Sequence, residues 1–327
     1  MTRPPAQKEP TAVTSPTTTP QAVPAATSTS GLLAGLGAYA IWGAFPAFFG
    51  LLTFLSPLEV VAHRIVWTVV LMLAVLGFAG HLGELKGLPR RTWGMVAAAS
   101  LFISINWGMY VFAVATGHVV EAALGYFINP LVSVLFGVIV FKESINRVQI
   151  CAVILAAVAV AVLTADYGRP PWIALTLAMS FASYGVVKKL IPLRPAVSLT
   201  AEGLVALPAA LTIVMVALLS GTPHAFSFGP AQTLLVLCLG PITAAPLLLF
   251  GRAAQAVPLV TLGILQYLTP GMQMTWGILV VHEDMPPARW AGFTLIWIAL
   301  AVFTANAVIS LGSSRRVGRV DRDPTFR

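Results

Sequence analysis

A glutamate, a histidine and an arginine lie together in the otherwise apolar stretch EVVAHRIVW. Glu59 and His63 are one helical turn apart, and Arg64 lies on a neighbouring face of the same expected helix. Arg64 would lie roughly 9 Å below Leu58 along that helix. A cation at that depth should face the interior of the protein or a water-filled cavity, and it should have a partner there. Because its planar fork suits carboxylates and phosphates, Arg64 is the first candidate for contact with an anionic or polar substrate group.

Purely structural roles for these charges stay open. Glu59 is a candidate coupling group, but it falls in the first turn of its helix, where a carboxylate suits the helix dipole and can reach water. Arg64 could form a structural pair with Glu59 or Glu121, since intramembrane charges often pair with one another. Glu202 holds a comparable place in a later apolar run, but that run has no basic counterpart to Arg64.

Glu121 begins a second informative stretch, EAALGYFINPLVSVLFGVIVFKE. It could couple transport to protons, because a buried carboxylate can take up and release a proton. It could equally be a simple partner for the dipole at a helix N-terminus. Pro130, inside the stretch, lacks an N–H, so it should bend the helix and free carbonyl groups for neighbours, water or a ligand.

The same pattern occurs a second time, in LGILQYLTPGMQMTWGILVVHE. Residues 121–140 align without a gap onto residues 261–280, so that Pro130 matches Pro270. Corresponding interruptions in two halves of a membrane protein point to a binding site near the midplane. Each polar or aromatic side chain near these interruptions could instead join neighbouring helices by hydrogen bonds or anchor its helix at the membrane interface. These candidate substrate contacts are Asn106, Trp107, Tyr126, Asn129, Gln266 and Tyr267.

The composition is that of a membrane protein. Of the 327 residues, 58% are hydrophobic and 9% are charged, whereas soluble domains carry about a quarter charged residues. Long continuous apolar runs favour an all-α integral membrane protein over a transmembrane barrel. The net charge of +8 comes from scattered basic residues rather than a basic stripe, so we expect no nucleic-acid partner. The histidines lack metal-ligand spacing and the glycines form no phosphate loop, so we expect no metal, cofactor or catalytic constellation.

About ten runs are long enough to be considered membrane spans. The weakest is 171–187, which is short and carries Ser180, Ser183 and Tyr184. The expected spans are 32–52, 58–79, 93–115, 119–140, 148–165, 171–187, 199–220, 231–251, 258–281 and 288–311. The expected domains are a disordered cytoplasmic tail at 1–30, a first five-helix repeat at 31–165, a second at 171–311 and a basic cytoplasmic tail at 312–327.

The placement of basic residues gives an orientation. With both termini in the cytoplasm, most of the loop arginines and lysines fall inside, and Arg169 and Arg289 fall outside. Because each half has an odd number of spans, the two halves would enter the membrane from opposite sides. Inverted repeats of this kind are typical of secondary transporters, whose site opens alternately to each side.

Several segments together resemble one family. They are YAIWG (39–43), EVVAHRIVW (59–67), NWGMYVFAV (106–114), EAALGYFINPLV (121–132) and LQYLTP (265–270). They are similar to the RarD proteins, in the EamA-type branch of the drug/metabolite transporter superfamily, and the resemblance covers about residues 31–311. The resemblance implies a ten-helix permease of the inner membrane, made of inverted five-helix repeats and linked to chloramphenicol sensitivity. It carries over no substrate and no binding residue.

The function expected from these observations is secondary transport of a small molecule across the cell membrane, without enzymatic activity. The partners expected are that substrate and the lipid bilayer. The alternative is an intramembrane enzyme or sensor that uses Arg64, His63 and Glu121 for chemistry. A transporter accounts better for the repeat, because two-sided access needs the symmetry and an enzyme does not. The cargo, its direction, the use of protons or exchange, and the oligomeric state stay open.

Overall fold

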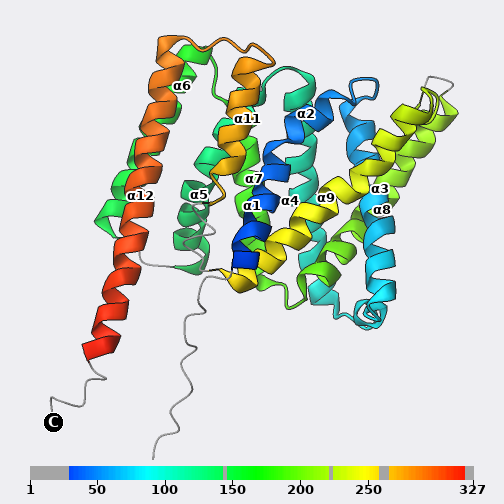
Figure 1. Ribbon diagram of the computed structural model, residues 1–327, viewed down its shortest axis with the longest axis horizontal. Coiled ribbons are helices and arrows are strands. Elements are labelled where there is room, and N and C mark those ends of the chain that lie inside the picture. Colours follow the sequence, from blue (N-terminus) through cyan, green and yellow to red (C-terminus); the bar gives the residue numbers. More distant parts are fainter. Residues whose placement is uncertain (1–28, 143–145, 221–223, 258–264, 321–327) are drawn as a thin grey trace, which may run out of the picture.

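A computed structural model describes residues 29–142, 146–220, 224–257 and 265–320 of the chain (Figure 1). The first helices are α1 (Thr29–Gly43), α2 (Phe45–Gly50), α3 (Pro57–Phe78), the short 3-10 helix η1 (Leu82–Leu85), α4 (Arg90–Ala115), α5 (Val119–Phe141) and α6 (Arg147–Tyr167). They are followed by α7 (Trp172–Leu190), α8 (Pro195–Leu219), α9 (Pro230–Ala256), α11 (Leu268–Leu279) and α12 (Pro287–Val320). The described residues contain no strand, so the all-α expectation is confirmed.

Within the described ranges, 8 helices are long and apolar enough to cross a membrane. The expected span 32–52 is divided between α1 and α2, with a turn at Ala44. The weak run at 171–187 is helical, but its apolar part, Trp172–Lys188, is shorter than the other spans. Of the expected span 258–281, residues 258–264 lie outside the description, and α11 has 12 residues. The expected tail at 1–30 lies almost wholly outside it too.

The two matched prolines lie in different helical settings. Pro130 is inside the continuous helix α5, where its missing N–H leaves the carbonyl of Tyr126 without its usual intrahelical donor. Pro270 lies in the first turn of α11, where a helix does not need that N–H. The expectation of two equivalent mid-helix breaks stays a prediction, because residues 258–264, which precede the second proline, lie outside the described residues.

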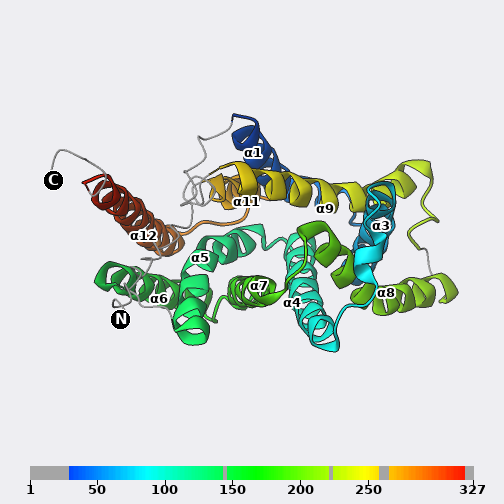
Figure 2. The same ribbon diagram turned by 90° about the horizontal axis from the view of Figure 1, so that it is seen from below.

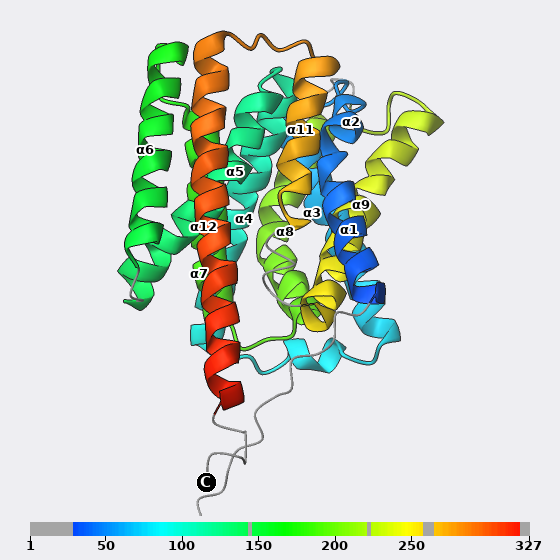
Figure 3. The same cartoon turned by 60° about the vertical axis from the view of Figure 1, so that its left-hand side comes forward.

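The helices pack as an elongated bundle with a pair at each edge. Seen from below, α6 and α12 form one edge, and α3 and α8 form the other (Figure 2). Between them, α1 packs on α9, α4 packs on α7, and α5 packs on both α7 and α11. The first residues of α1 and the end of α12 lie at the same end of the bundle (Figures 1 and 3). We call this the terminal end and the opposite one the far end.

Two of the five buried apolar clusters in the described residues are large. The first core cluster lies around α3 and includes Phe45, Phe49 and Tyr110. The second core cluster joins α5, α6 and α12 and includes Phe127 and Phe293. Close helix contact in these cores depends on glycine at several crossings. Of the candidate site residues, Trp107 and Tyr126 pack against the first core cluster and Tyr267 packs against the second.

Candidate functional site

Arg64 is buried in the interior of the bundle. Its side chain on α3 is 3% exposed, and its Nε donates a hydrogen bond to Thr243 Oγ1 on α9 at 2.9 Å. Among the residues that the structure describes, no carboxylate forms an ion pair with Arg64. The structural pairs considered from the sequence, with Glu59 or Glu121, are not formed, because both carboxylates are bound elsewhere. A buried cation without a counter-charge is costly in a membrane protein.

Aromatic rings surround the guanidinium group. Its carbon lies 4.1 Å from the ring centroid of Trp107, 5.3 Å from that of Phe45 and 5.5 Å from that of Phe49. The electron-rich faces of such rings attract a cation, and more strongly when water is excluded. The rings come from α2 and α4, and Thr243 comes from α9, so three helices contact the charge of α3. Phe45 and Phe49 could not be linked to Arg64 from the sequence, since nothing in their spacing indicates the contact.

Two tyrosines complete the surroundings of Arg64. They are Tyr110 from α4, whose ring centroid lies 6.2 Å from that of Phe45 and 5.9 Å from that of Phe49, and Tyr126 from α5. Their ring centroids lie 5.8 Å apart. Tyr110 is 2% exposed, and its hydroxyl has no hydrogen-bond partner among the described residues. We call Arg64, Phe45, Phe49, Trp107, Tyr110, Tyr126 and Thr243 the Arg64 cluster.

The neighbours of Arg64 on α3 point to separate parts of the fold. Glu59 completes a capping box with Ser56: the Ser56 hydroxyl donates to Glu59 Oε2 at 2.8 Å and accepts from the Glu59 N–H at 3.3 Å. The geometry is that of a helix start. His63 is buried with its ring edge against Phe226, 5.5 Å between centroids. Glu59, His63 and Arg64, the three ionisable residues of the EVVAHRIVW stretch, therefore do not form one site.

Glu121 connects α5 to the start of α7. It is 1% exposed, and its two oxygens accept from Arg169 Nη2 at 2.9 Å and Nη1 at 3.4 Å. Glu121 Oε1 also accepts from the backbone N–H of Ile173 at 3.1 Å, which satisfies one of the free donors in the first turn of α7. Arg169 alone is enough to balance the carboxylate, so Glu121 has a clear structural role at the far end.

Asn106 and Asn129 have different surroundings. Asn106 Nδ2 donates to the Leu177 carbonyl at 3.0 Å and to Ser180 Oγ at 3.1 Å, so it joins α4 to α7. Asn129, just before Pro130, is partly buried, and its Oδ1 has no partner in the described part of the chain. Asn106 is therefore occupied by helix packing, whereas Asn129 retains a free acceptor.

Gln266 and Tyr267 lie next to the start of α11, and both are partly exposed. Tyr267 packs against the second core cluster and lies beside Thr304 of α12. Trp107 and Tyr126, in contrast, pack against the first core cluster. The structure thus brings Trp107 and Tyr126 to Arg64, and it places Tyr267 in a different part of the core.

A second buried carboxylate lies between α7 and α8. Glu202 is 2% exposed and forms an ion pair with Lys188. Its carboxylate also accepts from Ser198 Oγ at 2.6 Å and from the Tyr184 hydroxyl at 3.2 Å. Lys188 lies fourteen positions before Glu202, so helical spacing within one helix could not reveal the pair. With its oxygens bonded on several sides, this carboxylate links α7 to α8.

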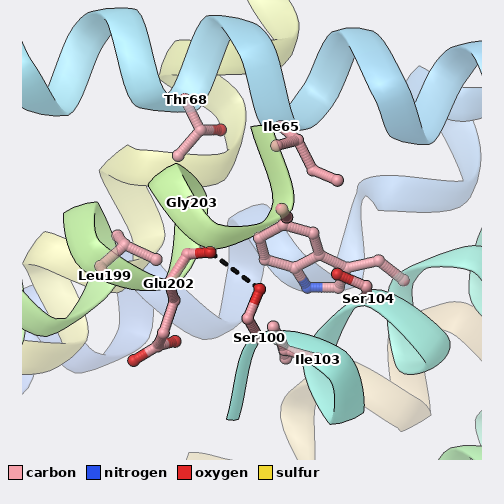
Figure 4. A pocket seen from close by; sticks show the side chains of 10 residues that line it. Ile65, Thr68, Ser100, Ile103, Ser104, Leu199, Glu202 and Gly203 are labelled. Atoms are coloured by element: carbon pink, nitrogen blue, oxygen red, sulfur yellow. Dashed lines mark hydrogen bonds between the residues drawn. The ribbon is translucent and has the colours of Figure 1, made fainter. Parts of the chain in front are cut away.

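A small cavity lies between α3, α4 and α8 (Figure 4). Its volume is about 10 Å³, enough for roughly one water molecule. Ser100 points towards it and donates to the backbone carbonyl of Glu202 at 2.8 Å, while Thr68 faces it from α3 (Figure 4). A larger apolar crevice of about 510 Å³ shares Ile65 and Ser104 with this cavity. Trp107 also lines the small cavity, so its indole stands between the cavity and Arg64.

Comparison with known proteins adds a family. The EamA-like transporter family matches residues 29–165. The chain is 47% identical over 293 residues to Protein RarD of Streptomyces exfoliatus, covering 88% of this chain and 91% of that protein. It is 42% identical over 277 residues to the uncharacterized transporter YojE of Bacillus subtilis (strain 168), covering 83% and 92%. One solved crystal structure superposes with a TM-score of 0.57 at 17% identity, covering 85% of this chain and 98% of that one, a likeness of fold alone.

These likenesses agree with the apolar helices and with the absence of strands from the described ranges. Together they make this a multi-pass membrane protein of the transporter type. The high identity to proteins named RarD extends over nearly the whole chain and not just over the first half. The chain therefore belongs to the RarD proteins of the EamA-like transporter family.

Proposed function

We propose that this chain is a secondary transporter of a small molecule and that it works by alternating access between two inverted five-helix halves. The helix contacts support the repeat. If α1 and α2 together form one span, and this span, α3, α4, α5 and α6 correspond in order to α7, α8, α9, α11 and α12, the contact of α1 with α9 becomes the contact of α7 with α4. The pairs α3–α8, α5–α11 and α6–α12 each join a helix to its own counterpart. This pattern of contacts is what an approximate two-fold axis would produce.

The same arrangement supports an orientation in the membrane. Arg169 and Arg289, which the charge pattern assigns to the outside, are bound to Glu121 and Asp166 at the far end of the bundle. The helices α1 and α12 begin and finish at the terminal end. Both termini then lie in the cytoplasm, and the protein lies in the cell membrane, as the positive-inside rule favours.

The observation that carries the transport proposal is the buried, unpaired Arg64. It lies on α3 of the first half, bonds to Thr243 on α9 of the second and is covered by Trp107 on α4. A charge held between the two halves, with no carboxylate of its own among the described residues, is available to a substrate that the halves enclose. The Arg64 cluster is therefore the proposed substrate site, with Asn129 beside Pro130 as an additional acceptor.

Removal of this charge tests the proposal. Arg64→Ala should abolish transport and retain membrane insertion, measured by a metabolite screen of deletion cells and by uptake into proteoliposomes. Chloramphenicol is the first compound to assay, because the family resemblance links these proteins to it. Arg147→Ala, at an exposed arginine on α6, is the matched control and should transport normally. Normal transport by a well-inserted Arg64→Ala protein would remove Arg64 from the site.

Proton coupling through Glu121 stays a proposal. Its bonds to Arg169 and Ile173 give the carboxylate a structural task, so a proton would have to displace Arg169 to reach it. Glu59 is a weaker candidate, since it serves in the capping box. Transport that does not respond to an imposed pH gradient would contradict the coupling role of both residues. Facilitated diffusion or exchange would then be the mode of transport.

A further inference from the structure

The chemistry of the Arg64 cluster describes the substrate more closely than an unspecified small molecule. We infer that the Arg64 cluster binds an organic monoanion, with a carboxylate held by Arg64 and Tyr110 and a flat apolar body held by the surrounding rings. This inference rests on the proposed transport function only for the passage of the ligand, and its binding part can be tested separately.

The free hydrogen-bond donors of Arg64 define the position of the anion. A guanidinium group has five N–H donors, one on Nε and four on the two Nη atoms. Thr243 takes the Nε donor at 2.9 Å, so the side chain is fixed at one edge. The Nη donors have no hydrogen-bond partner among the described residues. A pair of parallel Nη donors matches the two oxygens of a carboxylate.

Tyr110 supplies a second, independent donor. Its ring lies among those that touch Arg64, with centroids 6.2 Å from Phe45 and 5.9 Å from Phe49. Its hydroxyl is fully buried and unpartnered in the described part of the chain. A buried hydroxyl without a partner is costly unless something else bonds to it. An anion on Arg64 would accept this hydrogen bond, and the cost would disappear.

The charge balance favours a single negative charge. Arg64 contributes one positive charge, and no carboxylate among the described residues forms an ion pair with it. A monoanion would neutralise the cluster, whereas a dianion would leave one unbalanced negative charge in a medium that penalises it. A phosphate monoester approaches two negative charges near neutral pH, so a carboxylate fits better.

The walls of the cluster favour a flat apolar body behind the carboxylate. Phe45, Phe49 and Tyr110 are at most 5% exposed, and the rings of the cluster pack against one another and against the guanidinium carbon at distances of up to 6.2 Å. A ligand that enters the cluster must therefore replace some of these ring contacts. Aromatic walls bind planar apolar groups by offset or edge contacts. A small hydrophilic anion such as acetate would bind at the charged end and leave the displaced ring contacts without a replacement.

Benzoate is the probe for a binding test on the purified full-length protein in detergent, with thermal stabilisation and titration calorimetry as readouts. Benzoate should stabilise the protein and bind more tightly than benzamide, its neutral isostere, than acetate, which lacks the ring, and than phenyl phosphate, the dianion. Arg64→Gln should abolish benzoate binding. Tyr110→Phe should raise its Kd about tenfold or more, the usual effect of losing a hydrogen bond to a charged group. Arg147→Gln, at an exposed arginine, should leave binding unchanged.

Equal binding of benzoate and benzamide would overturn the inference, and so would benzoate binding that survives in Arg64→Gln. If Arg64→Gln fails to fold, Tyr110→Phe decides, because it removes one buried oxygen that has no partner to lose among the described residues. Transport is measured separately in proteoliposomes. Arg64-dependent benzoate binding without transport of any compound would sustain this inference and defeat the transport proposal. Transport of neutral compounds alone, independent of Arg64, would sustain the transport proposal and defeat this inference.

Discussion

The contact between Arg64 and Thr243 is the residue-scale feature with the clearest consequence. Thr243 is 1% exposed and offers the only hydrogen-bond acceptor that the described chain gives to Arg64. Thr243→Val keeps the shape but leaves a buried charged donor unbonded, so we expect a loss of about 1–3 kcal/mol in the free energy of unfolding. We also expect weaker transport, because the guanidinium fork is no longer fixed. Denaturant unfolding in detergent and proteoliposome uptake would measure the two effects.

Two further threonine variants make this prediction specific. Thr243→Ser retains the hydroxyl and should preserve most of both properties. Thr212→Val removes a hydroxyl that bonds within α8 on an exposed face, so it should change stability by less than about 0.5 kcal/mol. Equal stability of Thr243→Val and Thr212→Val would show that the Arg64 bond contributes nothing.

At this scale the sequence predicted the charge but not its surroundings. Arg64 stands out because apolar residues flank it at a depth where a cation needs a reason to be present. Thr243 lies 179 positions away, and no local pattern links it to α3. Tyr110 lies one helical turn after Asn106, and that spacing was the available signal for it. This spacing does not show which rings Tyr110 contacts, because those rings come from other helices that only the fold brings together.

At the scale of elements, the loop between α11 and α12 is tied to the start of α5 by a carboxylate with a displaced pKa. Glu283 accepts from the Val120 N–H at 3.0 Å through Oε1 and at 3.2 Å through Oε2. Burial is the main cause that raises the pKa of Glu283 to about 7, against the opposing effect of these backbone N–H groups. The folded protein therefore binds a proton at Glu283 more tightly than the unfolded chain does.

The sign of the pH dependence follows from that shift. The stabilisation is complete below the ordinary pKa of a glutamate and is lost as the pH rises through about 7. We expect the Tm in detergent to fall by about 2 °C between pH 5 and pH 9 from this group, since solvent weakens the effect at a partly exposed site. Scanning calorimetry over that pH range would measure it.

Glu283→Gln should flatten this pH dependence, because the amide oxygen can still accept from Val120 and carries no charge at any pH. Asp284→Asn, at the exposed neighbouring acid, should leave the slope of Tm against pH the same as in the unchanged protein. If Glu283→Gln has the same slope of Tm against pH as the unchanged protein, groups other than Glu283 cause the pH dependence.

The elements themselves were largely predictable, and the exceptions have physical causes. Length and apolar content identified the long spans such as α3 and α4. The same criteria made 171–187 the weakest candidate, and it is the shorter apolar helix in the structure. Alignment of the prolines suggested two equal interruptions, but the effect of a proline depends on its place in the helix. Where a helix begins relative to its proline is decided by packing that the alignment does not contain.

At the scale of the whole molecule, glycines set how closely the helices approach. A Cβ added at Gly240 of α9 would lie 2.6 Å from the carbonyl oxygen of Trp67 on α3, and one at Gly125 of α5 would lie 2.8 Å from that of Ala174 on α7. Neither backbone can give way without moving a helix. Small residues let membrane helices pack through van der Waals contact, which is the main attraction available to them in lipid. The two crossings involve both of the helices, α3 and α5, that carry Arg64 and Tyr126.

Gly240→Ala should therefore separate α3 from α9 and disturb the bond between Arg64 and Thr243, which joins the same two helices. We expect a loss of about 1–3 kcal/mol in the free energy of unfolding, the usual cost of overpacking, together with reduced transport. The matched control is Gly94→Ala on the exposed face of α4, where an added Cβ meets nothing within 4 Å. That change should be neutral or stabilising by up to about 1 kcal/mol, because alanine favours the helix. Unfolding and uptake measured on both variants separate helix spacing from helix propensity: if Gly240→Ala behaves like Gly94→Ala, the close crossing of the two helices does not hold the site together.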